Sequence, residues 1–143
     1  MVRLVALLVT LVLAGAAPAH AQAGLSEADQ TAIRGVIAGQ LQAFREDDGP
    51  RAYGFAAPGI QLLFPTHQIF MKMVREGYPP VYRAAESEFR DIEALPEGRW
   101  LQHVLIVGAD GAVVMALYTM ELQPDGTWKI AGCILAPSNE ATT

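Results

Sequence analysis

Cysteine is almost missing from this sequence, because Cys133 is the only cysteine among its 143 residues. A single cysteine excludes an intrachain disulfide, whatever compartment the protein occupies. Cys133 lies in the apolar run Ile130–Leu135, where a free cysteine usually behaves as a small buried hydrophobic residue. A reactive or intermolecular thiol is the less favoured alternative.

Positive charge is also scarce. The chain has 10 lysines and arginines against 15 aspartates and glutamates, and its formal net charge is −5 at pH 7. The basic residues do not cluster in a patch. We therefore expect neither nucleic acid nor an anionic membrane surface as a partner.

A hydrophobic run long enough to span a membrane is missing too. The longest run, Leu4 to Leu13, has about half of the roughly 20 residues that a spanning helix needs. Arg3 precedes this run and the small-residue pattern Ala19-His20-Ala21 follows it, as in a signal peptide with its cleavage site. We predict a signal peptide at residues 1–21, a periplasmic or secreted protein, and no membrane attachment after cleavage.

Familiar signatures of catalysis and metal binding do not occur in the sequence. It contains no Ser-His-Asp pattern, no phosphate-binding loop and no dinucleotide fingerprint. His67 and His103 lack further ligands at metal-binding spacing. We therefore predict no metal site and no cofactor, and the catalytic residues, if any, stay unassigned.

The remaining chain has the length of one domain with one core. We assign residues 22–137 to a single α+β domain and residues 138–143 to a flexible polar tail. Loss of Arg3 with the signal peptide leaves nine basic and 15 acidic residues, a net charge of −6.

Helical signals fill the first half of this domain. Ser26 is a typical N-cap, and apolar residues after it recur at spacings of three and four. A second short helix is predicted at Arg51–Ala57, and a third at His67–Gly77, capped by Thr66.

Two segments near these helices are expected to be non-helical. Ile60–Phe64 is interpreted as a short strand or a tight connector. Tyr78–Tyr82 contains consecutive prolines, which are expected to prevent the third helix from continuing.

Strand signals fill the second half. Three apolar runs between Trp100 and Ala136 are separated by turns at Asp110-Gly111 and Pro124–Gly126, which predicts an antiparallel meander. Residues 84–94 have no clean period and are predicted to be mostly strand. The predicted fold is α+β, with three N-terminal helices packed on one face of a curved four-stranded antiparallel sheet.

Alternation along the strands predicts which side chains face the helices. The residues expected to face inward are Trp128, Ile130, Gly132 and Ile134. The residues expected on the outer face are Lys129, Ala131, Cys133 and Leu135, joined by Val114, Ala116 and Tyr118 if these also point outward. This outer face is unusually apolar, which predicts a homodimer through the outer sheet face or another partner protein.

Several segments also resemble a known family. YGFAAPGIQ, GYPPVYR and ALYTMELQPDGTWKIAGCILAP are similar to a bacterial family of exported proteins catalogued as domain of unknown function 4864, over roughly Leu25 to Pro137. That family looks like a branch of the nuclear-transport-factor-2-like superfamily, in which helices wrap a curved antiparallel sheet into a cone. The resemblance implies this cone-shaped fold, but the superfamily includes both enzymes and non-catalytic binding or dimerising domains.

Catalysis in such a cone usually requires a carboxylate or histidine base beside a hydroxyl donor. The candidate bases are Asp91, Glu93 and His103. The two acids lie two residues apart on one strand, where a solvated face is the ordinary interpretation. His103 points outward if its neighbour Gln102 points inward.

A ligand could instead be held at the rim of the cone. In GYPPVYR, Tyr78 and Tyr82 flank a rigid Pro-Pro beside Arg83, so the segment either grips a ligand or is a stiff connector. Gln102 is either a polar ligand contact or a core residue satisfied by backbone or water. The predicted ligand-binding residues are Tyr78, Tyr82, Arg83, Gln102, Tyr53 and Trp100.

These observations favour a non-catalytic domain that binds a small apolar or weakly acidic ligand, dimerises, or binds another protein. The alternative is an isomerase, dehydratase or hydrolase that uses a carboxylate or histidine base inside the cone.

Overall fold

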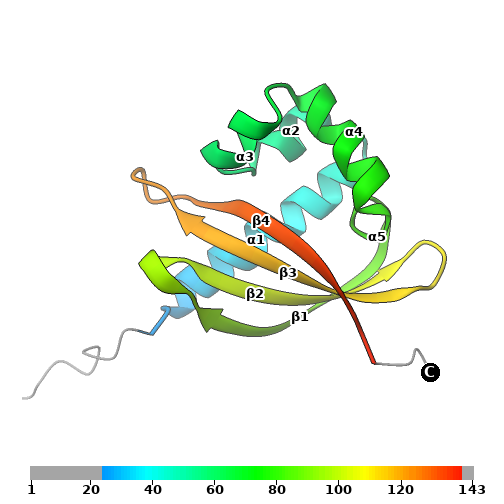
Figure 1. Ribbon diagram of the computed structural model, residues 1–143. Coiled ribbons are helices and arrows are strands. Elements are labelled where there is room, and N and C mark those ends of the chain that lie inside the picture. The colour runs from blue at the N-terminus through cyan, green and yellow to red at the C-terminus, as the bar shows by residue number, and fades with distance from the viewer. Residues whose placement is uncertain (1–23, 140–143) are drawn as a thin grey trace, which may run out of the picture.

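The computed structural model describes residues 24–139, which form five helices followed by a four-stranded antiparallel sheet (Figure 1). The predicted signal peptide, and residues 140–143 of the predicted tail, lie outside this range. Within residues 24–139, no helix combines the length and apolar character needed to cross a membrane.

The first helix, α1 (Glu27–Arg45), crosses the back of the sheet in Figure 1. As predicted, Ser26 caps it, with its hydroxyl accepting from the backbone N–H of Asp29 at 3.0 Å. The Asp29 carboxylate also accepts from the indole of Trp128 at 3.0 Å, which ties the start of α1 to the last strand. A stripe on α1 is buried in the core and comprises Ile33, Ile37, Leu41 and Phe44.

Two further helices were predicted and are present. These are α2 (Gly49–Gly54) and α4 (His67–Gly77), and the hydroxyl of Thr66 caps α4 as expected. The prediction of three helices was nevertheless wrong, because α3 (Pro58–Leu63) and α5 (Pro79–Tyr82) are helical as well. Both begin with proline, and the first turn of a helix needs no N–H from that residue, so proline favours rather than prevents helix there.

The sheet has the predicted strands in sequential order: β1 (Ala84–Ala94), β2 (Trp100–Gly108), β3 (Val113–Leu122) and β4 (Trp128–Pro137). A short turn of 3-10 helix, η1 (Pro96–Gly98), joins the first two. The two later turns contain Gly111 at φ 83° and Gly126 at φ 88°, in the left-handed region that favours glycine. The prediction of a four-stranded antiparallel meander is confirmed.

A bulge interrupts the alternation of β4. Thr119 pairs with Gly132, but the next residue, Met120, pairs with Ile130, so Ala131 is an extra residue on β4. Because side chains alternate with a period of two, one extra residue reverses the two faces of the strand beyond it.

The bulge overturns part of the predicted face assignment. Trp128 and Ile130 are buried as expected, but beyond the bulge Cys133 packs against the core and Ile134 is 67% exposed. Leu135 also packs against the core, so the inward placement of the Ile134 side chain and the outward placement of Cys133 and Leu135 were wrong. On β3, the conditional outward placement of Val114, Ala116 and Tyr118 was wrong as well. Ala116 and Tyr118 are buried, and Val114 packs against the core.

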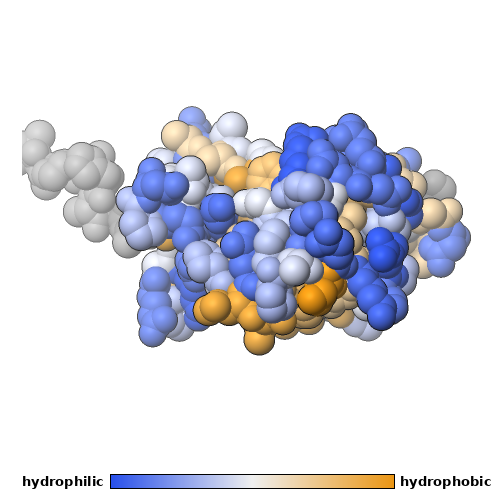
Figure 2. Space-filling view, turned by 90° about the horizontal axis from the view of Figure 1, so that it is seen from above, coloured by the Kyte–Doolittle hydropathy of each residue, from blue (hydrophilic) through white to orange (hydrophobic). Residues whose placement is uncertain are grey.

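The outer face of the sheet is still apolar, but with different residues. Pairing across β2, β3 and β4 places these side chains on it: Leu101, Leu105, Val107, Val113, Met115, Leu117, Ile134 and Ala136. At the β1 edge, Glu86, Glu88 and Glu93 pair with residues of this face. In the view of Figure 2, hydrophobic residues gather along one margin of the molecule, while the surface turned to the viewer is mostly hydrophilic.

Candidate ligand-binding cavity

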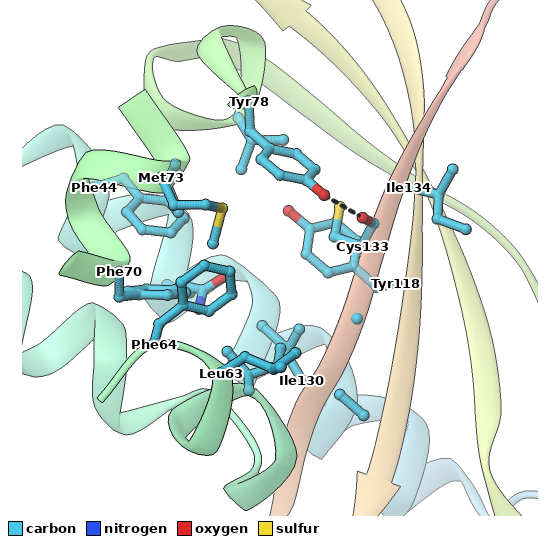
Figure 3. Close-up of a pocket in the computed structure, with 16 residues that line it drawn as sticks. Phe44, Leu63, Phe64, Phe70, Met73, Tyr78, Tyr118, Ile130, Cys133 and Ile134 are labelled. Carbon is cyan, nitrogen blue, oxygen red and sulfur yellow. Dashed lines mark hydrogen bonds between the residues drawn. The ribbon is translucent and has the colours of Figure 1, made fainter. Parts of the chain in front are cut away.

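A cavity of about 280 Å³ lies between the helices and strands β3 and β4 (Figure 3). On the helical side its walls are apolar, with Phe44, Phe64, Phe70 and Met73 among the lining residues. The aromatic rings pack on one another, with centroids 6.1 Å apart for Phe44–Phe70 and 6.5 Å for Phe64–Phe70. This cluster gives the cavity a firm aromatic wall.

The sheet side of the cavity owes its shape to the bulge. Ala131 and Gly132 contribute only a methyl group and backbone to this wall, and its other lining residues are Tyr118, Ile130, Cys133 and Ile134. Small residues facing a row of aromatic rings leave space that larger side chains would fill.

Three neutral side chains with oxygen or nitrogen donors border this apolar space: Tyr118, Tyr78 and Gln40. Tyr118 is 1% exposed, and its hydroxyl lies against the Cys133 thiol and reaches no oxygen or nitrogen partner among the residues that the structure describes. The Tyr78 hydroxyl donates to the backbone carbonyl of Cys133 at 3.0 Å. Gln40 donates its amide to the carbonyl of Ala52 at 3.1 Å. Figure 3 shows that the hydroxyls of Tyr118 and Tyr78 approach the same end of the cavity.

Burial keeps the ionisable groups of the cavity neutral. Burial raises the pKa of Tyr118 well above its usual range, and the neighbouring Cys133 raises it further. Burial also raises the pKa of Tyr78. Burial also raises the pKa of the Cys133 thiol to about 12. No aspartate, glutamate, histidine, lysine or arginine lines the cavity. The cavity walls therefore carry no charge at neutral pH and no base that titrates near pH 7.

Of the six predicted ligand-binding residues, only Tyr78 lines the cavity. Arg83 instead binds Asp47, with both carboxylate oxygens 2.9 Å from its Nη2, and its guanidinium lies 4.0 Å from the ring centroid of Tyr82. The Tyr82 hydroxyl also donates to Asp47. These hydrogen bonds, from Tyr82 first and Arg83 second, lower the pKa of Asp47. Tyr82 and Arg83 thus join α5 to the turn after α1.

Tyr53 and Trp100 also lie outside the cavity lining. Tyr53 donates its hydroxyl to the carbonyl of Phe64 at 2.6 Å and packs on Phe70, so it fixes the end of α3 beside the cavity. Trp100 begins β2, where it is half-buried and pairs with Ala94 and Met120.

Gln102 points into the core, as its predicted register required, but its side chain binds the backbone of the sheet and not a ligand site. Its Nε2 donates to the carbonyls of Arg90 at 2.9 Å, Asp91 at 3.3 Å and His103 at 2.9 Å. A register shift of β1 between Phe89 and Ile92 contains two of these carbonyls. Gln102 therefore satisfies the backbone of an irregular strand, which was the alternative interpretation of this residue.

The three candidate bases are all remote from the cavity lining. Asp91 and Glu93 are exposed on β1. His103 is half-buried on the outer face, with its Nε2 3.7 Å from a carboxylate oxygen of Glu93. Across the described part of the chain, no group of three or more His, Cys, Asp and Glu side chains could hold a metal ion.

Sequence reasoning missed most of the cavity. Tyr118 and Cys133 were placed on the wrong face, and Phe64 was taken for part of a strand or connector. The one local signal was the adjacent pair of small residues Ala131-Gly132 within an apolar strand, which is typical of a bulge.

The structure thus defines an α+β protein whose helices and antiparallel sheet border an apolar cavity. Residues 26–143 match the family described as Domain of unknown function (DUF4864), and the chain belongs to that family. A search of curated proteins and a search of solved structures each found no match.

Proposed function

We propose that this protein is an exported, non-catalytic domain that binds a small apolar ligand in the cavity between its helices and sheet. The observation that supports this proposal is the character of the walls: a space of about 280 Å³ lined only by apolar and neutral polar side chains. Small-molecule sites are typically concave and mostly apolar, with a few convergent polar groups.

Two alternatives have less support. An isomerase, dehydratase or hydrolase would need a base at the reacting atoms, and Asp91, Glu93 and His103 all lie outside the cavity lining. A weakly acidic ligand would favour a cation in the cavity, but Arg83 is bound to Asp47 and does not line it.

A fluorescent apolar probe tests the binding proposal. N-Phenyl-1-naphthylamine is neutral, and we expect it to bind the full chain with micromolar affinity, independently of pH between 5.5 and 8.5, because no cavity group titrates there. Leu63 lines the cavity and is 75% exposed, whereas its neighbour Leu62 is 83% exposed and does not line it. Leu63→Asp should weaken binding at least about fivefold, because it places a charge at the apolar wall.

Leu62→Asp is the matched control, since it adds the same charge at the same end of α3. It should change the affinity less than twofold. Native mass spectrometry of protein purified from the bacterial periplasm is the second readout, and a retained small molecule is expected. Absence of both probe binding and a retained molecule, or equal effects of the two variants, would contradict the proposal.

We further propose that the outer sheet face binds a second copy of this chain. Leu101, Leu105, Met115 and Leu117 surround His103 at its centre, and Ile134 extends it to β4. A largely apolar face of this kind is typical of homodimer interfaces and unusual on a wet sheet surface.

The charges at the edges of this face support a second copy as the occupant. Glu86, Glu88 and Glu93 flank the face along β1, and Lys129 on β4 pairs with Glu121 at the opposite side. A two-fold axis parallel to the strands would place the β1 edge of one copy over the β4 edge of the other, so Glu93 would lie near the level of Lys129, whose Nζ also donates to the carbonyl of Gly54 at 2.8 Å.

Sedimentation or light scattering tests this proposal. We expect a dimer at micromolar concentration, and Leu117→Glu should convert it to a monomer, because the new carboxylate would be buried without a partner at the centre of the interface. The control is Leu122→Glu, since Leu122 is half-exposed at the end of β3 and pairs with the core residue Trp128 rather than with the outer face. A wild-type monomer at high micromolar concentration would contradict the proposal.

We also propose that the fold is a cone of the nuclear-transport-factor-2-like kind. This proposal is supported by the long helix α1, which crosses the sheet (Figure 1), and by the cavity between the helices and the sheet (Figure 3).

A further inference from the structure

The Tyr118 hydroxyl is the one polar group of the described cavity walls that is fully buried without an oxygen or nitrogen partner. It lies against the Cys133 thiol, and a thiol sulfur is only a weak acceptor. A buried hydroxyl with so weak a partner is less stable than one that donates to an oxygen. Such a group in a native protein requires an explanation, and a ligand acceptor supplies one.

The other polar groups of the cavity are already engaged as donors. Tyr78 donates to the carbonyl of Cys133, and Gln40 donates to the carbonyl of Ala52. The proton of the Tyr118 hydroxyl, in contrast, goes to no oxygen or nitrogen, and Figure 3 shows this hydroxyl directed into the cavity, toward the space bordered by Met73 and Tyr78.

From these contacts we infer the chemical class of the ligand and its orientation, an inference that rests on the proposed function. The ligand is a neutral molecule with one oxygen acceptor, such as a ketone, an ester or an alcohol. Its oxygen accepts the hydrogen bond of Tyr118, and its apolar body lies along Phe64, Phe70 and Met73 toward the exposed side chain of Leu63.

Charge and size both narrow this class. A carboxylate would enter a space lined by no cation, where desolvation of its charge is not offset. A pure hydrocarbon would fit the walls but would leave the Tyr118 hydroxyl unpaired. The volume of about 280 Å³ is at the small end of the range for ligand sites, which excludes a long-chain lipid lying wholly within it.

Three naphthalenes of nearly equal size test this inference: 2-acetonaphthone, 2-ethylnaphthalene and 2-naphthoate. Their affinities are measured by displacement of N-phenyl-1-naphthylamine. The ketone should bind about tenfold more tightly than the hydrocarbon, the ratio expected for one net hydrogen bond of typical strength. The naphthoate anion should bind more weakly than the ketone.

Tyr118→Phe is the decisive variant, because it removes only the hydroxyl. It should lower the affinity for the ketone to that for the hydrocarbon, leave the hydrocarbon within twofold, and keep the melting temperature at or above that of the wild type. If the ketone and the hydrocarbon bind the wild type equally, or if the anion binds best, the inference is wrong and the proposed function stands. If N-phenyl-1-naphthylamine and all three naphthalenes fail to bind the wild type, the proposed function fails, and the inference fails with it.

Discussion

Gln102→Glu is expected to lower the free energy of unfolding at pH 7 by about 3–5 kcal/mol, the cost of an unpaired buried charge. Gln102 is fully buried, and its amide donates to the carbonyls of Arg90, Asp91 and His103. A glutamate carboxylate has no proton to donate, so it would place its charge against these carbonyl oxygens. Urea denaturation measures the loss.

The loss should depend on pH, and its sign follows from burial. Burial and the surrounding carbonyls would raise the pKa of the new carboxyl in the folded state, so the folded protein would bind a proton more readily than the unfolded chain. The variant should therefore be closer to the wild type at pH 5 than at pH 8.

Gln102→Met is the control, since methionine fills a similar space without charge. It should cost about 1–3 kcal/mol, the penalty of leaving buried carbonyls unpaired, with no pH dependence between 5 and 8. A glutamate variant within 1 kcal/mol of the wild type, or a loss that grows at low pH, would contradict this account of Gln102.

The second large effect is expected at high pH and involves Cys133. Burial raises the pKa of its thiol from a usual value of 9.0 to about 12 in the folded protein. Between these values the unfolded chain releases the proton and the folded protein keeps it, so stability falls as the pH rises. The total loss is at most about 4 kcal/mol, and roughly 1 kcal/mol of it should be present at pH 10.

Comparison with Cys133→Ala isolates the loss of stability that comes from titration of the thiol, because the tyrosines and lysines titrate in both proteins. Between pH 8 and pH 10 the wild type should lose roughly 1 kcal/mol more than the variant, measured by urea denaturation. The folded wild type should also react slowly with iodoacetamide at pH 8, since the thiolate is the nucleophile. Parallel pH profiles for the two proteins would show that the thiol is not buried as described.

Regular elements with strong local signals were predictable from the sequence. α1, α4 and the turns at Gly111 and Gly126 each have a capping residue, an apolar period or a glycine that specifies them locally. α3 and α5 were not predicted, because a proline at the start of a short helix has the same sequence appearance as a proline that ends one. Their helical state depends on packing against the rest of the protein.

The cavity could not be predicted because it depends on pairing between distant strands. The bulge at Ala131 decides whether Cys133 or Ile134 faces inward. The alternation of side chains along β4 does not reveal this bulge. Gln102 shows the same limit. Its inward direction followed from alternation, but its carbonyl partners lie in the irregular part of β1, which only the folded sheet reveals.

The bulge at Ala131 makes the pairing of β4 as important as its composition. If Ala131 paired with Thr119 in a regular ladder, every later side chain would turn to the opposite side, so that Cys133 and Leu135 would join the outer surface. Deletion of Ala131 would instead leave the observed partners unchanged, with Gly132 opposite Thr119 and Ile134 opposite Leu117. A single-codon deletion at this position would thus remove the irregularity and keep both the lining of the interior and the covering of the exterior.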